Sequence, residues 1–279
     1  MRFVAPERAS IDASVFARPP LSLWSEFADL LRGSEWPDVT TLNARARGEG
    51  IPHFVAQTRD LDREDLHYEV RIDSRNEVAT RERNWHDLLN ALVWVRFPEL
   101  KSALNARQIA SIARAGTKQR TRAQCALTHF DEAGVIVVLR DASLLPRWDA
   151  HDWHGLFWRE SGAWREGRIE AVVFGHALLE HALRPGQLLV GKALACAMPQ
   201  SGKVDDAIAG VAAAIRAGAL LNDPQELRPL PLSGIPGWHP GTADETFYRT
   251  APCFRPLRAG RAYPGAVSWS DPGPALRCG

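Results

Sequence analysis

This chain is organised around one segment, Arg81-Glu82-Arg83-Asn84-Trp85-His86-Asp87-Leu88-Leu89-Asn90-Ala91-Leu92-Val93-Trp94-Val95. From residue 84 onward it contains no Lys, Arg or Glu, and at 100° per residue its apolar side chains surround most of a helix. A helix without a solvated face is buried on most sides, so its polar side chains need partners inside the protein. These partners, or a ligand, are where function is to be sought. The polar side chains are Asn84, His86, Asp87 and Asn90.

Length and composition set the broad class of protein. The chain has 279 residues, of which 45% are hydrophobic and 24% charged, as is typical of globular proteins with one large or two small domains. A net charge of +1 argues against a general nucleic-acid or membrane-surface binder, although a local basic patch remains compatible with it. The longest run of apolar or small residues, 207–215, is too short to cross a bilayer.

The termini and cysteines favour a cytoplasmic protein. Residues 1–10 carry charges and lack the apolar core of a secretory signal. The four cysteines, Cys125, Cys196, Cys253 and Cys278, are scattered without Cys-x-x-Cys spacing. We therefore expect reduced thiols rather than a zinc ribbon or a disulfide framework.

Hydrophobic periodicity and breakers predict the elements on either side of the central helix. Alternation predicts strands at 51–57 and 67–72, and a hairpin whose strands, 126–130 and 135–139, are joined by a loop with Gly134 at positive φ. Residues 169–174 fit either a strand that turns at Gly175 or the start of a longer helix. The remaining predictions are helices at 21–31, 98–115, 143–164, 176–183 and 204–217, and a strand at 188–196.

The composition changes at residue 229. Nine prolines lie between Pro229 and Pro274, and they exclude long helices and central strands. We predict a compact domain over 1–228 and an extended proline-rich strap over 229–279 that wraps the same domain. The predicted fold class is α+β, mostly helical, with a small β-sheet that includes a hairpin.

Several motifs together resemble a proteobacterial family of unknown function, domain-of-unknown-function family 3025. They span roughly residues 50 to 258 in the expected order, and the resemblance implies one domain that includes the proline-rich segment, without implying a reaction. The motifs are Asn84-Trp85-His86-Asp87-Leu88, Asn90-Ala91-Leu92, Phe97-Pro98, Phe130-Asp131-Glu132, Gly134-Val135, Phe174-Gly175-His176-Ala177-Leu178, Glu180, Pro229-Leu230-Pro231, Gly234-Ile235-Pro236-Gly237-Trp238 and Phe254-Arg255-Pro256.

Two helices offer a pair of metal-ligand side chains at the same spacing. His86 and Asn90 are four residues apart, as are His176 and Glu180, so each pair shares a helix face. If the helices converge, these groups suit Zn, Fe or Mn, and a bound water would be activated for hydrolysis of an unknown small molecule.

Nearby polar residues complete this hypothesis. Glu132, at the predicted hairpin tip, is the candidate general base, and Glu180 is a second carboxylate available as base. Asp131 beside Glu132 is a further candidate catalytic residue or metal ligand. Asn84 and Asp87 are expected to form hydrogen bonds to the metal-ligating side chains without binding the metal themselves. If Gly175 marks a strand-to-helix turn, His176 lies in the first helical turn, where the helix dipole keeps its imidazole neutral.

Each of these residues also has a purely structural interpretation. A single histidine on an apolar helix is more often a hydrogen-bonded core residue than a ligand. Asp131 fits a turn in which its side chain accepts backbone N–H bonds, and Glu180 can pair with Arg184 one helical turn later. His151 and His154 share a helix face as well, but a surface role is expected for them.

Two other functions remain open from the sequence. Residues 101–122 contain six cations and no acid, so they predict a phosphate- or nucleic-acid-binding surface, or simply a solvated basic face. Alternatively, the buried histidines only connect the helices of a non-catalytic interaction protein. A metal-dependent hydrolase is our first hypothesis. The six cations are Lys101, Arg107, Arg114, Lys118, Arg120 and Arg122.

Overall fold

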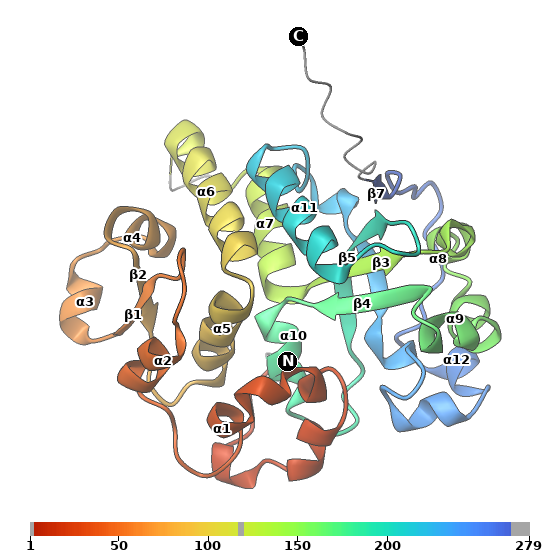
Figure 1. Cartoon of the computed structure of the whole chain (residues 1–279), viewed down its shortest axis with the longest axis horizontal. Coiled ribbons are helices and arrows are strands. Elements are labelled where there is room, and N and C mark those ends of the chain that lie inside the picture. The colour runs from red at the N-terminus through yellow and green to blue at the C-terminus, as the bar shows by residue number, and fades with distance from the viewer. Residues whose placement is uncertain (1–2, 117–119, 269–279) are drawn as a thin grey trace.

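The fold is centred on a mixed five-stranded sheet (Figure 1). The structure, a computed structural model, describes residues 3–116 and 120–268. In the sheet, β3 (Gly134–Leu139) lies between β4 (Ile169–Val173), which is antiparallel to it, and β5 (Val190–Ala197), which is parallel. All six residues of β3 are buried, as expected of a central strand covered on both faces.

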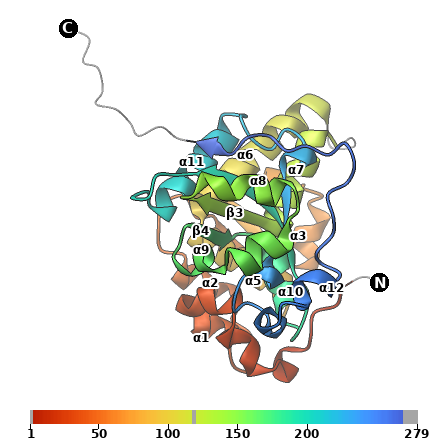
Figure 2. The same ribbon diagram turned by 90° about the vertical axis from the view of Figure 1, so that its right-hand side faces the viewer.

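The C-terminal segment contributes two strands to the same edge of β5. Strand β6 (Arg228–Pro231) pairs antiparallel with residues 190–193, and β7 (Val267–Ser268) pairs parallel with residues 196 and 197. Pro229 and Pro231 are accommodated because β6 is an edge strand. Between β6 and β7 the C-terminal segment runs along the outside of the molecule (Figure 2, blue). Residues 269–279, with Pro272, Pro274 and Cys278, lie outside the described residues.

Helices surround this sheet, and the central helix is buried as predicted. It is α5 (Trp85–Arg96), which packs against α10 (His176–Ala182). Helix α6 (Pro98–Ala115) begins with the predicted proline and packs against α7 (Arg122–Ala133) and α11 (Val204–Arg216). The predicted helices at 98–115, 176–183 and 204–217 and the strands at 51–57 and 188–196 are confirmed within a few residues.

A small lobe precedes α5 and forms one wall of the cleft described below. It contains two parallel strands, β1 (His53–Ala56) and β2 (Glu77–Thr80), connected through α3 (Arg59–Arg63) and α4 (Tyr68–Arg75) (Figure 1). The strand predicted at 67–72 is therefore wrong. Tyr68 and Ile72 are four residues apart, so the same side chains also fit one face of a helix, and Arg71 on that helix pairs with Glu64 and Glu77.

The predicted hairpin is also wrong in its first half. Residues 126–130 belong to α7, which begins with a capping box formed by Thr121 and Gln124. Gly134 has a φ of −67°, so it does not serve a turn. Its role is close packing, because a Cβ there would lie 2.2 Å from the Phe130 carbonyl oxygen.

The predicted helix over 143–164 is interrupted, because His151 has a φ of +55°. Its pieces are the 3-10 helix Ala142–Leu144, α8 (Leu145–Asp149), the π-helix His154–Arg159 and α9 (Ser161–Arg165). The predicted 21–31 helix is a 3-10 helix, Leu21–Phe27, followed by α1 (Ala28–Leu31). The other elements are α2 (Val39–Arg45), α12 (Phe247–Thr250) and the 3-10 helices Arg8–Ser10, Ala13–Ala17, Pro224–Glu226, Leu232–Gly234 and Pro240–Ala243.

Together these elements confirm the α+β class. Within residues 3–116 and 120–268, no helix has both the length and the apolar character needed to cross a membrane. Cys125, Cys196 and Cys253 are free thiols. Burial raises the pKa of Cys196 to about 12 and that of Cys253 to about 11, so neither is an activated nucleophile.

Candidate functional site

A polar cleft of about 290 Å³ lies between the small lobe and the helices α5, α6, α7 and α10. The small lobe supplies side chains from α4 and β2, and the four helices supply the opposite wall. The cleft contains both histidines of the metal hypothesis, His86 and His176, together with Glu132, and is called the histidine cleft below. Long-range folding thus brings residues 86, 132 and 176 to one place.

The two histidines face each other directly. Nε2 of His86 and Nε2 of His176 are 3.0 Å apart, with the ring planes at 78°. Two unprotonated ring nitrogens at this distance would oppose their lone pairs, so a proton or a cation must lie between them. Glu132 Oε2 is 3.7 Å from His176 Nε2, and one ligand atom from each of the three residues lies within 4.8 Å of the others.

A close approach of backbone segments produces this arrangement. The segment 169–183 forms strand β4, a turn at Gly175 and helix α10, which is the first of the two alternatives predicted. A Cβ on Gly175 would lie 2.5 Å from Ala133 Cα and from Gly134 N, so only glycine lets the turn pass the end of α7. His176 is consequently placed beside Glu132, one residue before Ala133.

Glu180 lies behind His86 rather than between the histidines. Its Oε2 is 3.1 Å from His86 Nδ1, on the side of the ring away from His176. This hydrogen bond raises the pKa of His86 and outweighs the opposing effect of burial. A carboxylate that accepts the Nδ1 proton leaves Nε2 as the free ligand atom, which is the usual support of a metal-binding histidine.

His176 is buried, with only 3% of its surface exposed. Burial lowers its pKa to about 3, so its imidazole is neutral at physiological pH. Its Nδ1 makes no hydrogen bond to any described residue. A buried neutral imidazole is the form of histidine that binds metals.

A hydrogen-bonded network closes the floor of the cleft. The Lys101 ammonium donates to Asp131 Oδ1 at 2.6 Å and to Asn90 Oδ1 at 2.8 Å, and Asn90 donates to the Tyr68 hydroxyl at 2.9 Å. Burial would raise the pKa of Asp131, but the Lys101 ammonium outweighs it and holds that pKa below its ordinary value. Burial raises the pKa of Tyr68. Asn90, predicted as a metal ligand, and Asp131, predicted as a catalytic residue or further ligand, thus bond to Lys101.

Two further predicted residues fix the start of α5. Asn84 caps the helix by accepting a bond from Asp87 N at 3.0 Å. The Asp87 carboxylate binds the Arg81 guanidinium at 2.7 Å and the Arg81 backbone N–H at 2.6 Å. Asn84 thus contacts the backbone one residue after His86, and Asp87 ties the first turn of α5 to the backbone of Arg81.

The predicted basic run does not gather on one surface. Lys101 is buried at the cleft floor, Arg107 donates to Asn222 at 2.8 Å, and Arg122 pairs with Asp223 at 2.8 Å. Arg114 donates to a carbonyl of its own helix, and Arg120 lines the histidine cleft. Lys118 lies outside the described residues.

Sequence reasoning missed the residues that support the site. The alternating pattern places Tyr68 in a strand, although it lies on α4 and reaches Asn90. The basic run predicts Lys101 only as a phosphate ligand. Its position among Leu100, Ala103 and Leu104, all buried, was the available signal that this lysine would need an internal carboxylate.

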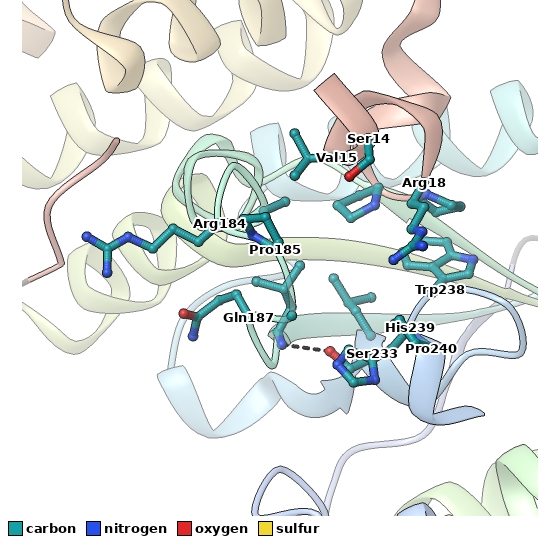
Figure 3. Close-up of a pocket in the computed structure, with 16 residues that line it drawn as sticks. Ser14, Val15, Arg18, Arg184, Pro185, Gln187, Ser233, Trp238, His239 and Pro240 are labelled. Carbon is teal, nitrogen blue, oxygen red and sulfur yellow. Dashed lines mark hydrogen bonds between the residues drawn. The ribbon is translucent and has the colours of Figure 1, made fainter. Parts of the chain in front are cut away.

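Figure 3 shows a second hollow, of about 60 Å³, between the N-terminal segment and the loops around Pro185 and Trp238. Arg18 lies near Trp238 in this view, whereas Arg184 extends away. Its one bond between the drawn residues joins Leu189 N to Ser233 Oγ at 2.9 Å. A hollow of this size holds a few water molecules, so the larger histidine cleft is the better candidate for a substrate site.

Comparison with known proteins identifies the family of this chain but assigns no reaction to it. No curated protein matches this chain, and no solved structure matches it. The profile of a family described as "Protein of unknown function (DUF3025)" matches residues 52–258, which include every residue of the histidine cleft named above. The chain therefore belongs to the DUF3025 family.

Proposed function

We propose that this protein is a metal-dependent hydrolase whose divalent ion is bound by His86, His176 and Glu132. The observation that carries the proposal is the 3.0 Å separation of the two Nε2 atoms, with the Glu132 carboxylate 3.7 Å from one of them. Two imidazoles and a carboxylate form a ligand set used by hydrolytic zinc sites and also suited to Fe and Mn. A donor set of three leaves coordination positions open for water and substrate.

The surrounding residues support this assignment. His176 is neutral and needs no deprotonation before it binds a cation. Glu180 holds His86 by Nδ1 and so directs Nε2 toward His176. When bound, a divalent ion would lower the pKa of a coordinated water toward neutrality and make it a nucleophile.

The cleft also limits the class of substrate. Its volume of about 290 Å³ is that of a small-molecule site. Amide and hydroxyl side chains, among them Gln57, Asn105, Gln108 and Thr128, line it. We therefore propose a small polar ester, amide or phosphoester, cleaved with water as the only co-reactant.

Glu132 enters the proposal as a ligand rather than as the general base. Its side chain is 42% exposed and can reach a cation between the two rings. The alternative role is separable by experiment. If the carboxylate is a ligand, Glu132→Gln should release the metal. If it is instead the general base, the same variant should lose hydrolysis and retain the metal.

The test is elemental analysis of protein purified without a His-tag and without chelators. We expect about one Zn, Fe or Mn ion per chain, and hydrolysis within a panel of ester, amide and phosphoester substrates that is lost on chelation and restored by the same metal. The competing interpretation is a structural pair that shares one proton between the two Nε2 atoms. Sub-stoichiometric metal in every preparation would favour that pair and contradict the hydrolase.

A further inference from the structure

A separate cleft lies beside the C-terminal segment and shares no lining residue with the histidine cleft. Its volume is about 720 Å³. One wall comes from residues 188–192 at the start of β5, and another from residues 252–263 of the C-terminal segment, which Figure 2 shows on the outside of the molecule. A site of this size is within the range of small-molecule pockets.

The charge of this cleft is strongly one-sided. Four cations line it, and none of the described lining residues is acidic. Among residues 3–116 and 120–268, none of the four forms an ion pair, and three of them, Lys192, Arg255 and Arg258, are exposed. The nearby carboxylates are committed elsewhere, since Asp149 pairs with Arg228 and Asp223 with Arg122. The four cations are Lys192, Arg255, Arg258 and Arg261.

The segment that carries the arginines is held in place before any ligand binds. The Arg261 guanidinium lies 4.2 Å from the centroid of the Tyr263 ring and donates to the Gln225 carbonyl. The Tyr263 hydroxyl is 3.0 Å from His151 Nε2, and the Arg255 carbonyl accepts from Trp153 Nε1 at 2.7 Å. A pre-positioned cation loses little side-chain freedom on binding, which favours anion recognition.

The same cleft also has an apolar wall. It is formed by Leu188, Val190 and Leu227, and Val190 is 37% exposed, which is unusual for a large apolar side chain in this protein. An inorganic anion would use the arginines and leave this wall in water. A ligand that joins several phosphates to a flat, largely apolar ring would use both.

We propose that this cleft binds a nucleoside polyphosphate. The arginines and Lys192 contact the phosphates, and the apolar wall packs against the base. The site does not depend on the metal or on hydrolysis at His86 and His176. It also differs from the predicted basic run of residues 101–122, none of which lines it.

The test is a calorimetric titration of the full-length protein with ATP, inorganic tripolyphosphate and adenosine at low and high salt. We expect saturable binding of ATP, at least about tenfold weaker binding of tripolyphosphate and of adenosine, and weaker binding of ATP at high salt. Lys192→Glu/Arg258→Glu should weaken ATP binding by about tenfold or more, because both side chains are exposed and their reversal places like charges in the cleft.

Two controls localise the effect. Arg114→Glu/Arg216→Glu changes the charge by the same amount on α6 and α11, and it should leave the ATP affinity within about twofold at moderate salt. His86→Leu should leave it unchanged as well. The proposal is overturned if ATP does not bind, if both double variants weaken it equally, if His86→Leu abolishes it, or if only long single-stranded oligonucleotides bind.

Discussion

Two regions of this protein each contain a pair of histidines that are close in space or in sequence, and the hydrogen bonding of the two pairs differs. Around α8 and the π-helix, His151 bonds through both ring nitrogens, to the Arg255 carbonyl at 3.1 Å and to the Tyr263 hydroxyl at 3.0 Å, and His154 bonds to Glu245 at 2.8 Å. In the histidine cleft, the two Nε2 atoms face each other and His176 Nδ1 has no partner among the described residues. The partners of His151 and His154 are protein groups and need no bound ion, whereas the facing Nε2 atoms of His86 and His176 require a proton or a cation between the rings.

Each region also contains one buried cation paired with a carboxylate. Lys101 binds Asp131 at 2.6 Å beneath the histidine cleft, and Arg228 binds Asp149 at 2.6 Å near His151. Because both regions contain such a pair, a buried ion pair does not identify the metal site. The facing Nε2 atoms of His86 and His176, with the unpartnered Nδ1 of His176, do.

The largest expected effect concerns metal retention. His86→Leu should abolish bound metal. It also leaves the largely buried Glu180 carboxylate without its hydrogen-bond partner, so the free energy of unfolding of the metal-free protein should fall by about 1–3 kcal/mol. His151→Asn, which tolerates the positive φ, should keep the metal and lose about 1–2 kcal/mol with its hydrogen bonds. Elemental analysis and urea denaturation measure both. Equal metal content in the two variants would remove the distinction between the regions.

The next effect concerns the buried ion pair that each region contains. Lys101→Met leaves the Asp131 carboxylate buried without its cation and should lower the free energy of unfolding by about 3–5 kcal/mol. Arg228→Met, which leaves Asp149 without its cation, should lower the free energy of unfolding by a similar amount. The double variant Lys101→Met/Asp131→Leu should recover much of the stability lost in Lys101→Met. Denaturant unfolding of the four proteins gives these values. A negligible loss for Lys101→Met alone would mean that its pair contributes no structural support to the cleft.

The smallest effect, when measured over a single pH unit, is a pH dependence in the metal-free protein. The pKa of His176 falls from 6.5 in the unfolded chain to about 3 in the folded one, so between these values the unfolded state binds the extra proton. The free energy of unfolding should therefore fall as the pH decreases from 6.5 toward 3, by about 1.4 kcal/mol per pH unit from this residue. His176→Leu should remove this part of the slope, and His151→Asn should remove less. An unchanged acid slope in His176→Leu would show that this imidazole is not kept neutral by the fold.

Much of this arrangement was predictable where the apolar pattern was long. The burial of α5 and the convergence of His86 with His176 follow from two apolar helices that both needed internal partners. The short runs 67–72 and 126–130 were misassigned, since four to six alternating residues fit both a strand and one helix face. Asp131 and Glu132 still lie at the cleft, because both a hairpin tip and a helix end place them directly before β3.

Other parts of the site were beyond the sequence. Glu180 could point toward the space between the two histidines or toward Nδ1 of His86. The outcome depends on the rotation of α10 about its axis, which is set by packing. The pairing of Lys101 with Asp131 joins residues 30 positions apart and depends on the angle between α6 and α7. Local patterns do not determine such distances.

The double use of the β5 edge has a consequence for synthesis on the ribosome. Among the described residues, β6 and β7 are the last strands to be synthesised, and until β6 emerges the nascent chain presents one side of β5 with its backbone N–H and C=O groups unpaired. The half-made sheet is thus open to pairing with another chain from the synthesis of β5 until that of β6. A chaperone that shields this edge would improve the yield of folded protein, and a premature stop codon before residue 228 would produce an aggregating fragment rather than a shorter version of the domain.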